Sequence, residues 1–124
     1  MFTGLTPILS TPDLPRLLAF YAGGLDAEET YRFPDDGTPG YVALDVGGAR
    51  LGIAADPAST AADGPQRHAL WVYCTDADAA ADRLVQAGGT VVSPPTDMPW
   101  GERVADLHDP DGNRLHVDFP ASEG

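Results

Sequence analysis

The chain has 124 residues, of which 43% are apolar, and it carries seven basic residues, all arginine, against nineteen acidic ones. This length is sufficient for one domain with its own core, and a single cysteine excludes an internal disulfide. The formal net charge of -12 repels nucleic acid and anionic lipid, so we expect neither as a partner. Two interpretations of the charge stay open: a preference for cationic ligands, or solubility alone.

The sequence lacks the features of a targeting or spanning segment. No N-terminal stretch combines a basic start with an apolar run, and no apolar run approaches the ~20 residues that cross a bilayer. We therefore expect a cytoplasmic protein. The absence of lysine also excludes a lysine Schiff base or lysine general base.

The first half of the chain predicts one helix among four strands. The strands are expected over residues 4–10, 27–33, 40–46 and 50–55, with a Gly47-Gly48 hairpin joining the last two. Asp13 is an N-cap candidate, and Gly23-Gly24 predicts the end of the helix. The apolar stripe of this helix has the spacing of a single face: Leu14, Leu17, Leu18 and Tyr21.

The second half repeats this order. A loop-like stretch over residues 56–66 is followed by an expected strand over 68–74, an Asp76 cap, a helix ended by Gly88-Gly89, and a strand over 90–93. The second helix has a stripe of small apolar residues: Ala77, Ala80, Ala81 and Leu84. Residues 99–119 then predict two strands joined by a tight Asp-Pro-Asp-Gly turn, in which Asp109 and Asp111 can accept backbone hydrogen bonds.

The two halves match at a nearly constant offset. Asp76 follows Asp13 by 63 positions, and Gly112–Val117 follows Gly48–Ile53 by 64. The sequence therefore predicts an α+β fold in a single domain (1–124), built from two tandem β-α-β-β-β modules, 1–56 and 67–124, with a linker at 57–66. We expect the modules to form a curved, half-open mixed sheet around a cleft, with the helices on its outer face.

Strand alternation predicts which side chains line that cleft. Each helix must cover the uniformly apolar side of its sheet, so that side takes Leu5, Pro7 and Leu9, then Leu51 and Ile53, Leu70, Val72 and Cys74, and finally Leu115, Val117 and Phe119. The opposite side carries a mixed set: Thr6, Gly52, Ala69, Trp71, Tyr73, His116 and Asp118.

Three segments resemble the vicinal oxygen chelate superfamily, which includes glyoxalase I, extradiol dioxygenases, and fosfomycin and bleomycin resistance proteins. They are residues 7–25, residues 70–92, and Pro99-Trp100-Gly101 with Asp109–Asn113. Pro-Trp-Gly followed by Asp-Pro-x-Gly-Asn, a His and an aromatic residue looks most like the bleomycin resistance branch. The resemblance implies a homodimer whose two chains together enclose a ligand.

The resemblance also implies where a metal would bind. Metal-dependent members take ligands from four pseudo-symmetric positions, which correspond here to Thr6, Gly52, Ala69 and His116. Only the histidine is a good ligand, and a catalytic site usually needs three. We therefore expect no metal, no cofactor and no catalytic residues, and lean toward a protein that is not an enzyme. A register slip of one residue would bring in His68, but it would also turn Leu70 away from the helix.

The remaining candidates are aromatic and acidic residues on the cleft side. Rings interleaved with carboxylates suit a planar or cationic ligand, although Trp71 and Tyr73 have core packing as an alternative. The expected ligand-binding set is Tyr31, Phe33, Trp71, Tyr73, Trp100, Gly101, Glu102, His116 and Asp118. The favoured hypothesis is a metal-independent protein that sequesters a small molecule such as a cationic or aromatic antibiotic. A metal-dependent lyase, isomerase or dioxygenase and a ligand-sensing module are the alternatives.

Overall fold

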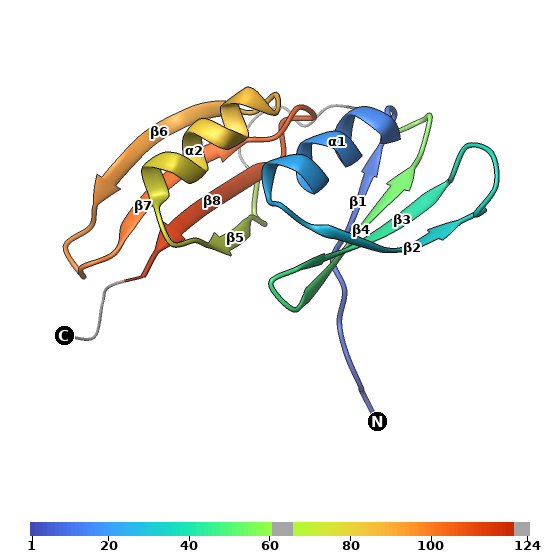
Figure 1. Ribbon diagram of the computed structural model, residues 1–124, viewed down its shortest axis with the longest axis horizontal. Helices are drawn as coiled ribbons and strands as arrows, with labels where there is room; N and C mark the ends of the chain where they lie inside the picture. The colour runs from blue at the N-terminus through green and yellow to red at the C-terminus, as the bar shows by residue number, and fades with distance from the viewer. Residues whose placement is uncertain (61–65, 121–124) are drawn as a thin grey trace. The chain divides into compact units, whose positions relative to one another are not determined.

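The computed structural model describes residues 1–60 and 66–120. The chain divides into two compact units, Met1–Thr60 and Ala61–Gly124. In each unit one helix packs against a sheet (Figure 1). The expected linker, residues 57–66, lies partly outside the described residues, so its boundaries stay predictions.

The secondary structure follows the same order in both units. The first unit contains β1 (Ile8–Thr11), α1 (Leu14–Gly24), β2 (Glu28–Phe33), β3 (Tyr41–Val46) and β4 (Ala49–Ala55). The second contains β5 (Leu70–Tyr73), α2 (Ala77–Gln86), β6 (Thr90–Asp97), β7 (Arg103–His108) and β8 (Arg114–Phe119). Within the described residues, neither helix is long and apolar enough to span a membrane.

Both sheets are mixed and have equivalent topology. Their strand orders are β1-β4-β3-β2 and β5-β8-β7-β6, with the strand before each helix parallel to the last strand and the other pairs antiparallel. In the parallel pairs Ile8 lies beside Gly52, and Trp71 lies beside His116. The predicted α+β fold of two β-α-β-β-β modules is confirmed.

Helix α1 begins at its predicted cap but buries a different stripe. The Asp13 side chain accepts a hydrogen bond from the Arg16 backbone N–H. Leu14, Leu17 and Tyr21 are buried as expected, whereas Phe20 is fully buried and Leu18 is only half-buried. The larger ring of Phe20 takes the core position and packs edge-on against Tyr21, with ring centroids 4.9 Å apart.

The two helices end differently. In α2, Gly88 has φ +115°, and the N–H of Gly89 donates to Leu84 O at 2.8 Å, which is the glycine-dependent ending that the sequence predicts. In α1, Gly23 and Gly24 instead belong to the helix. The ending comes later, because Leu25 N–H donates to Tyr21 O and the positive φ falls on Asp26, at 52°.

The first strand of each module is shorter than expected. The run over residues 4–10 yields only Ile8–Thr11, and Leu5 is 89% exposed rather than under the helix. Pro7 has no N–H to donate, so the ladder begins where its carbonyl accepts from Gly52 N–H. In β5, His68 and Ala69 precede the strand and are exposed, while β6 extends four residues beyond the expected 90–93.

The turn between β7 and β8 is built around Asp109. Its Oδ1 accepts from the backbone N–H groups of Asp111 and Asn113, at 2.9 and 2.8 Å, and its Oδ2 accepts from the Asn113 side chain at 2.8 Å. Gly112 has φ +85°, which completes the reversal. The predicted role of Asp109 is confirmed, and the turn aligns β7 with β8, which carries His116 and Asp118.

Candidate functional site

The face of the second sheet away from α2 combines polar side chains with burial. On β8, Leu115 and Val117 are 0% and 1% exposed on the helix side. His116 and Asp118 alternate with them on the other side, yet they are only 7% and 1% exposed. A buried histidine and a buried carboxylate on a sheet face without a helix require other groups to cover them.

Trp71 provides part of that cover. Its indole ring stacks on the His116 imidazole, with centroids 4.4 Å apart and an interplanar angle of 24°. The same indole donates its Nε1 hydrogen to Asp118 Oδ2 at 2.8 Å. Trp71 therefore fixes both polar groups of β8 while 44% of its own surface remains exposed.

Glu102 and Trp100 extend this arrangement from the β6–β7 loop. The loop turns tightly, since Gly101 N–H donates to Met98 O at 2.9 Å and Gly101 has φ +98°. Glu102 directly precedes β7, in which Val104 lies opposite Asp118. The interaction with Asp118 is the main cause of a raised pKa at Glu102, with desolvation adding to it and Trp100 opposing it, because two neighbouring carboxyls favour retention of a proton.

The result is a chain of side chains that runs Trp71, Asp118, Glu102, Trp100. The Trp71 indole N–H is bound to Asp118, and Asp118 and Trp100 both influence the Glu102 carboxyl. Tyr73 lies next to Asp118 in the parallel ladder and is 67% exposed, and Trp100 is 61% exposed. Trp71 and Tyr73 are therefore not core residues of this chain, and the core-packing alternative for them is wrong.

Asp106 is a neighbour of the site that the sequence analysis missed. It lies directly opposite His116 in the β7–β8 ladder, with its Oδ1 at 3.7 Å from His116 Nδ1. Both atoms are buried without a hydrogen-bond partner among the described residues. Burial lowers the pKa of His116, and the Asp106 carboxylate partly opposes that effect. Counting outward equally from the five residues 109–113 would have paired these two residues.

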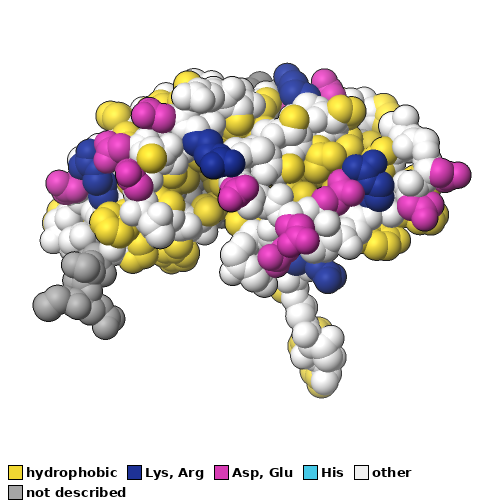
Figure 2. All heavy atoms as spheres, in the orientation of Figure 1, with side chains coloured by type: hydrophobic (Ala, Val, Ile, Leu, Met, Phe, Trp, Pro, Cys, Tyr) yellow, Lys and Arg dark blue, Asp and Glu magenta, His cyan; other side chains and the backbone are white. Residues whose placement is uncertain are grey.

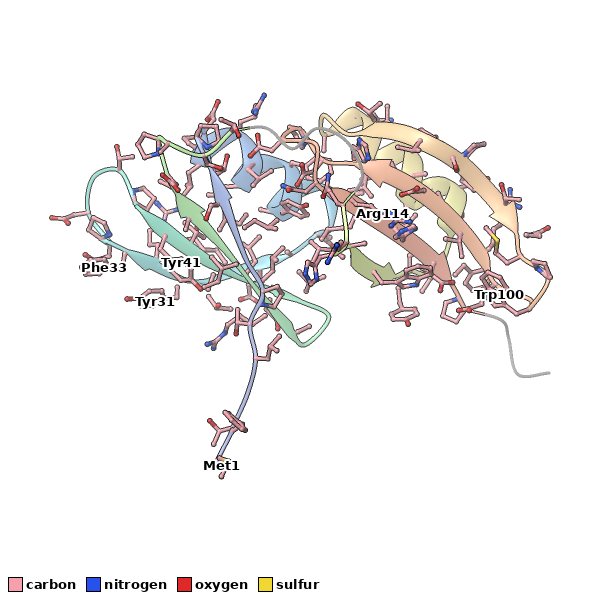
Figure 3. The ribbon with its side chains drawn as sticks, turned by 180° about the vertical axis from the view of Figure 1, so that it is seen from behind. Met1, Tyr31, Phe33, Tyr41, Trp100 and Arg114 are labelled. Carbon is pink, nitrogen blue, oxygen red and sulfur yellow. The ribbon has the colours of Figure 1, made fainter. Side chains whose placement is uncertain are left out.

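The corresponding face of the first module is aromatic. Gly52 occupies the position of His116, and Tyr41 fills the space above it: a Cβ on Gly52 would lie 2.5 Å from Tyr41 Oη. The Tyr31 and Tyr41 ring centroids are 6.2 Å apart, and Tyr31, Phe33 and Tyr41 lie close together in Figure 3. Tyr31 and Phe33 are 54% and 65% exposed. The structure thus gives the two modules different surfaces at equivalent positions.

The nine predicted site residues are divided between the modules. Tyr31 and Phe33 lie on the first sheet, and the structure gathers the others around β5, β8 and the β6–β7 loop of the second: Trp71, Tyr73, Trp100, Gly101, Glu102, His116 and Asp118. Figure 3 shows Trp100 at one end of that second sheet and Arg114 toward the other. The acidic character extends beyond the site, since acidic side chains are spread over the face seen in Figure 2.

The residues at the four family metal positions do not fit a divalent cation. Thr6 precedes β1, Gly52 has no side chain, Ala69 offers only a methyl group, and His116 is stacked under Trp71. Within residues 1–60 and 66–120, no group of three His, Cys, Asp or Glu side chains is arranged to hold a metal ion.

Cys74 does not offer an activated nucleophile. Its backbone N–H donates to Asp118 O at 2.9 Å, which places it at the end of the β5–β8 ladder. Burial is the main cause that raises the pKa of its thiol, so the reactive thiolate is disfavoured.

The paired modules and their mixed sheets define a vicinal oxygen chelate fold. The chain belongs to the Glyoxalase/Bleomycin resistance protein/Dioxygenase superfamily, whose family model matches residues 5–117. An uncharacterized protein of Mycobacterium bovis is 30% identical over 131 residues, which cover 96% of this chain and 84% of that protein. The finer assignment to the bleomycin resistance branch stays a prediction.

Solved structures share the fold at lower identity. TioX from Micromonospora sp. ML1 superposes with a TM-score of 0.76 at 23% identity, covering 95% of this chain and 98% of TioX. The fosfomycin resistance protein FosX from Mesorhizobium loti gives a TM-score of 0.72 at 19% identity, covering 98% and 95%. These likenesses establish a common architecture.

Proposed function

We propose that this protein binds a small aromatic or cationic molecule without a metal, using the face of the second module that carries Trp71, Trp100, Glu102 and Asp118. The observation that carries the proposal is the pairing of exposed rings with two adjacent carboxyls. A group of exposed aromatic side chains beside a buried acid is typical of a surface that binds a ligand. Sequestration of an antibiotic is the specific role that we favour.

The chemistry of the site supports a flat ligand. Trp71, Tyr73 and Trp100 each expose 44% or more of their surface and offer π faces for stacking. Glu102 and Asp118 supply the negative potential that attracts a cation to those faces. TioX and FosX have the same fold, and FosX is named a fosfomycin resistance protein, so this architecture also serves in antibiotic resistance.

Tryptophan fluorescence tests the proposal directly. The chain contains two tryptophans, both in the candidate site, so any change in emission reports on that face. We expect saturable quenching by at least one member of a panel of glycopeptide, aromatic and cationic antibiotics. Trp100→Phe should reduce the quenching, whereas Trp71→Phe should also weaken affinity because Asp118 loses its donor. Absence of saturable quenching across the panel would overturn the proposal.

Metal analysis separates this proposal from a metal-dependent lyase, isomerase or dioxygenase. Protein purified without chelators should contain substoichiometric Zn, Ni, Mn and Fe, and EDTA should leave ligand affinity unchanged. A stoichiometric transition metal that is lost on His116→Ala would contradict metal independence. A protein that binds a ligand without lowering its toxicity to cells would favour the ligand-sensing alternative.

We propose further that the functional form is a homodimer, as family membership suggests. Light scattering coupled to size exclusion measures this directly. A strictly monomeric mass in both the presence and the absence of a quenching ligand would contradict it.

A further inference from the structure

We infer that the ligand is held through an N–H-bearing cation, an amidinium, guanidinium or ammonium group, whose hydrogens are accepted by Asp118 and Glu102 between the two indoles. This inference rests on the proposed function and specifies the group that the site recognises. It excludes quaternary ammonium groups and neutral aromatic molecules as preferred ligands.

The first observation is an unused acceptor on Asp118. This side chain is 1% exposed, and its Oδ2 already accepts from the Trp71 indole. Its Oδ1 is buried and receives no hydrogen bond from any donor among the described residues. A buried carboxylate oxygen without a donor is costly, and an arriving N–H group removes that cost.

The second observation is the position of Glu102 beside Asp118. Glu102 directly precedes β7, in which Val104 lies opposite Asp118, and Asp118 raises the pKa of Glu102, so the two carboxyls act on each other. Such a pair is stabilised by a shared proton or by a donor from elsewhere. A planar cation with two or more N–H groups can donate to both acids at once. Such a cation takes the place of the shared proton and supplies the same single positive charge to the pair.

The nearby arginines do not fulfil this role. Arg103 donates to Asp78 and Asp97, at 2.8 and 3.0 Å, and Arg114 Nε lies 4.0 Å from Asp106 Oδ1. Neither guanidinium is therefore paired with Glu102 or Asp118. A bound cation can supply the countercharge of these two acids.

The flanking rings specify the shape of the ligand but not its hydrogen bonds. Cation–π contact with Trp71 or Trp100 would attract a quaternary ammonium as well as an amidinium. Only the amidinium also satisfies Asp118 Oδ1, so the acids rather than the rings decide between them. The difference between these two classes of cation is therefore the diagnostic measurement.

Benzamidine, benzamide and phenyltrimethylammonium form a matched set of probes. All three contain a phenyl ring, while only benzamidine combines positive charge with N–H donors. In a ¹H–¹⁵N spectrum the Trp71 indole N–H signal reports on the hydrogen bond to Asp118, and the Trp100 indole signal reports on the surroundings of Glu102. We expect benzamidine to shift both signals and to bind at least about tenfold more tightly than either control, as charge-assisted hydrogen bonds allow.

Two variants test whether the preference for benzamidine depends on the acidic side chains of the site. Glu102→Gln should reduce benzamidine affinity about tenfold while leaving benzamide affinity unchanged. Asp82→Asn, an exposed helix residue that changes the net charge equally, should leave both unchanged. The backbone amide signals of the same spectra verify that each variant is folded.

The outcomes separate the two proposals. Equal binding of benzamidine and benzamide, or equal binding of benzamidine and phenyltrimethylammonium, would overturn the inference and leave the proposed function standing. The same holds if an antibiotic quenches fluorescence while benzamidine shifts neither indole signal. If no antibiotic and no probe binds, both proposals fail.

Discussion

The indole of Trp71 stacks on the imidazole of His116 while its N–H binds Asp118, so one exposed side chain controls the burial of two polar groups. This relationship joins β5 to β8 at the point where the sheet ladder places the residues side by side. It also means that the properties of His116 depend on a neighbour from a strand far away in sequence.

Removal of the Trp71 ring should raise the pKa of His116. Burial lowers that pKa, and the facing Asp106 carboxylate favours the charged form once water enters. Trp71→Ala should therefore move the His116 titration, followed by NMR of the imidazole signals, upward in pH. Tyr73→Ala is the matched control, because Tyr73 lies beside Asp118 rather than His116 and should leave the titration unchanged. A His116 pKa that stays unchanged in Trp71→Ala would contradict this account.

Stability should decrease as the pH rises through the titration of Glu102. Its pKa is raised in the folded chain, mainly by the interaction with Asp118, so the folded state retains a proton that the unfolded state has already released. In that window the unfolded state binds fewer protons, and the free energy of unfolding falls with increasing pH.

Urea unfolding of the wild type and Glu102→Gln between about pH 4 and pH 8 measures this effect. Glutamine does not titrate and can donate to Asp118, so the variant should gain stability relative to the wild type as the pH increases. If the free energies of unfolding of the two proteins changed in parallel with pH, the coupling between Glu102 and Asp118 would be ruled out.

Gly52→Ala should destabilise the first module. The new Cβ would lie 2.5 Å from Tyr41 Oη and 3.0 Å from Ile8 Cγ1, so the Tyr41 ring must move. Overpacking of this kind costs about 1–3 kcal/mol. Thermal or urea unfolding measures the loss, and the cost of Gly52→Ala should fall clearly in a Tyr41→Ala background. Additive costs of the two substitutions would show that the rings and the glycine are not coupled.

Phe20→Ala should be much more damaging than Leu18→Ala. Phe20 is fully buried, and large-to-small substitutions of buried rings cost about 3–5 kcal/mol. Leu18 is half-buried, so its truncation should cost below about 2 kcal/mol. The comparison in one urea series tests which residue completes the core under α1, and similar losses for both would favour the stripe expected from helical spacing alone.

Much of the architecture was predictable from local signals. Asp13 and Asp76 cap their helices because a short carboxylate side chain accepts the free N–H groups of a first turn. Asp109 and Gly112 set the last hairpin in the same way, through local hydrogen bonds and positive φ. Such features depend on a few consecutive residues, so the repeated order of elements can be read along the chain.

Other features depended on competition between side chains. Helical spacing offered Leu18 to the core, whereas the structure buries Phe20 there instead. Strand propensity extended the first strand to residue 4, but Pro7 withholds a donor and the ladder starts at Ile8. Helical spacing and strand propensity limit the positions that a residue can occupy. Packing and hydrogen bonding determine which of those positions it takes.

The sequence alone determined the repeated α+β modules, the family resemblance and the residue types of the candidate site, because caps, turns and alternation are encoded locally. Only the tertiary structure decided that Trp71 covers His116, that Asp106 faces it, that Glu102 meets Asp118, and that Tyr41 fills the space over Gly52. These relationships join residues from different strands and loops. Their contacts depend on sheet register and side-chain packing, which form only when the chain is folded.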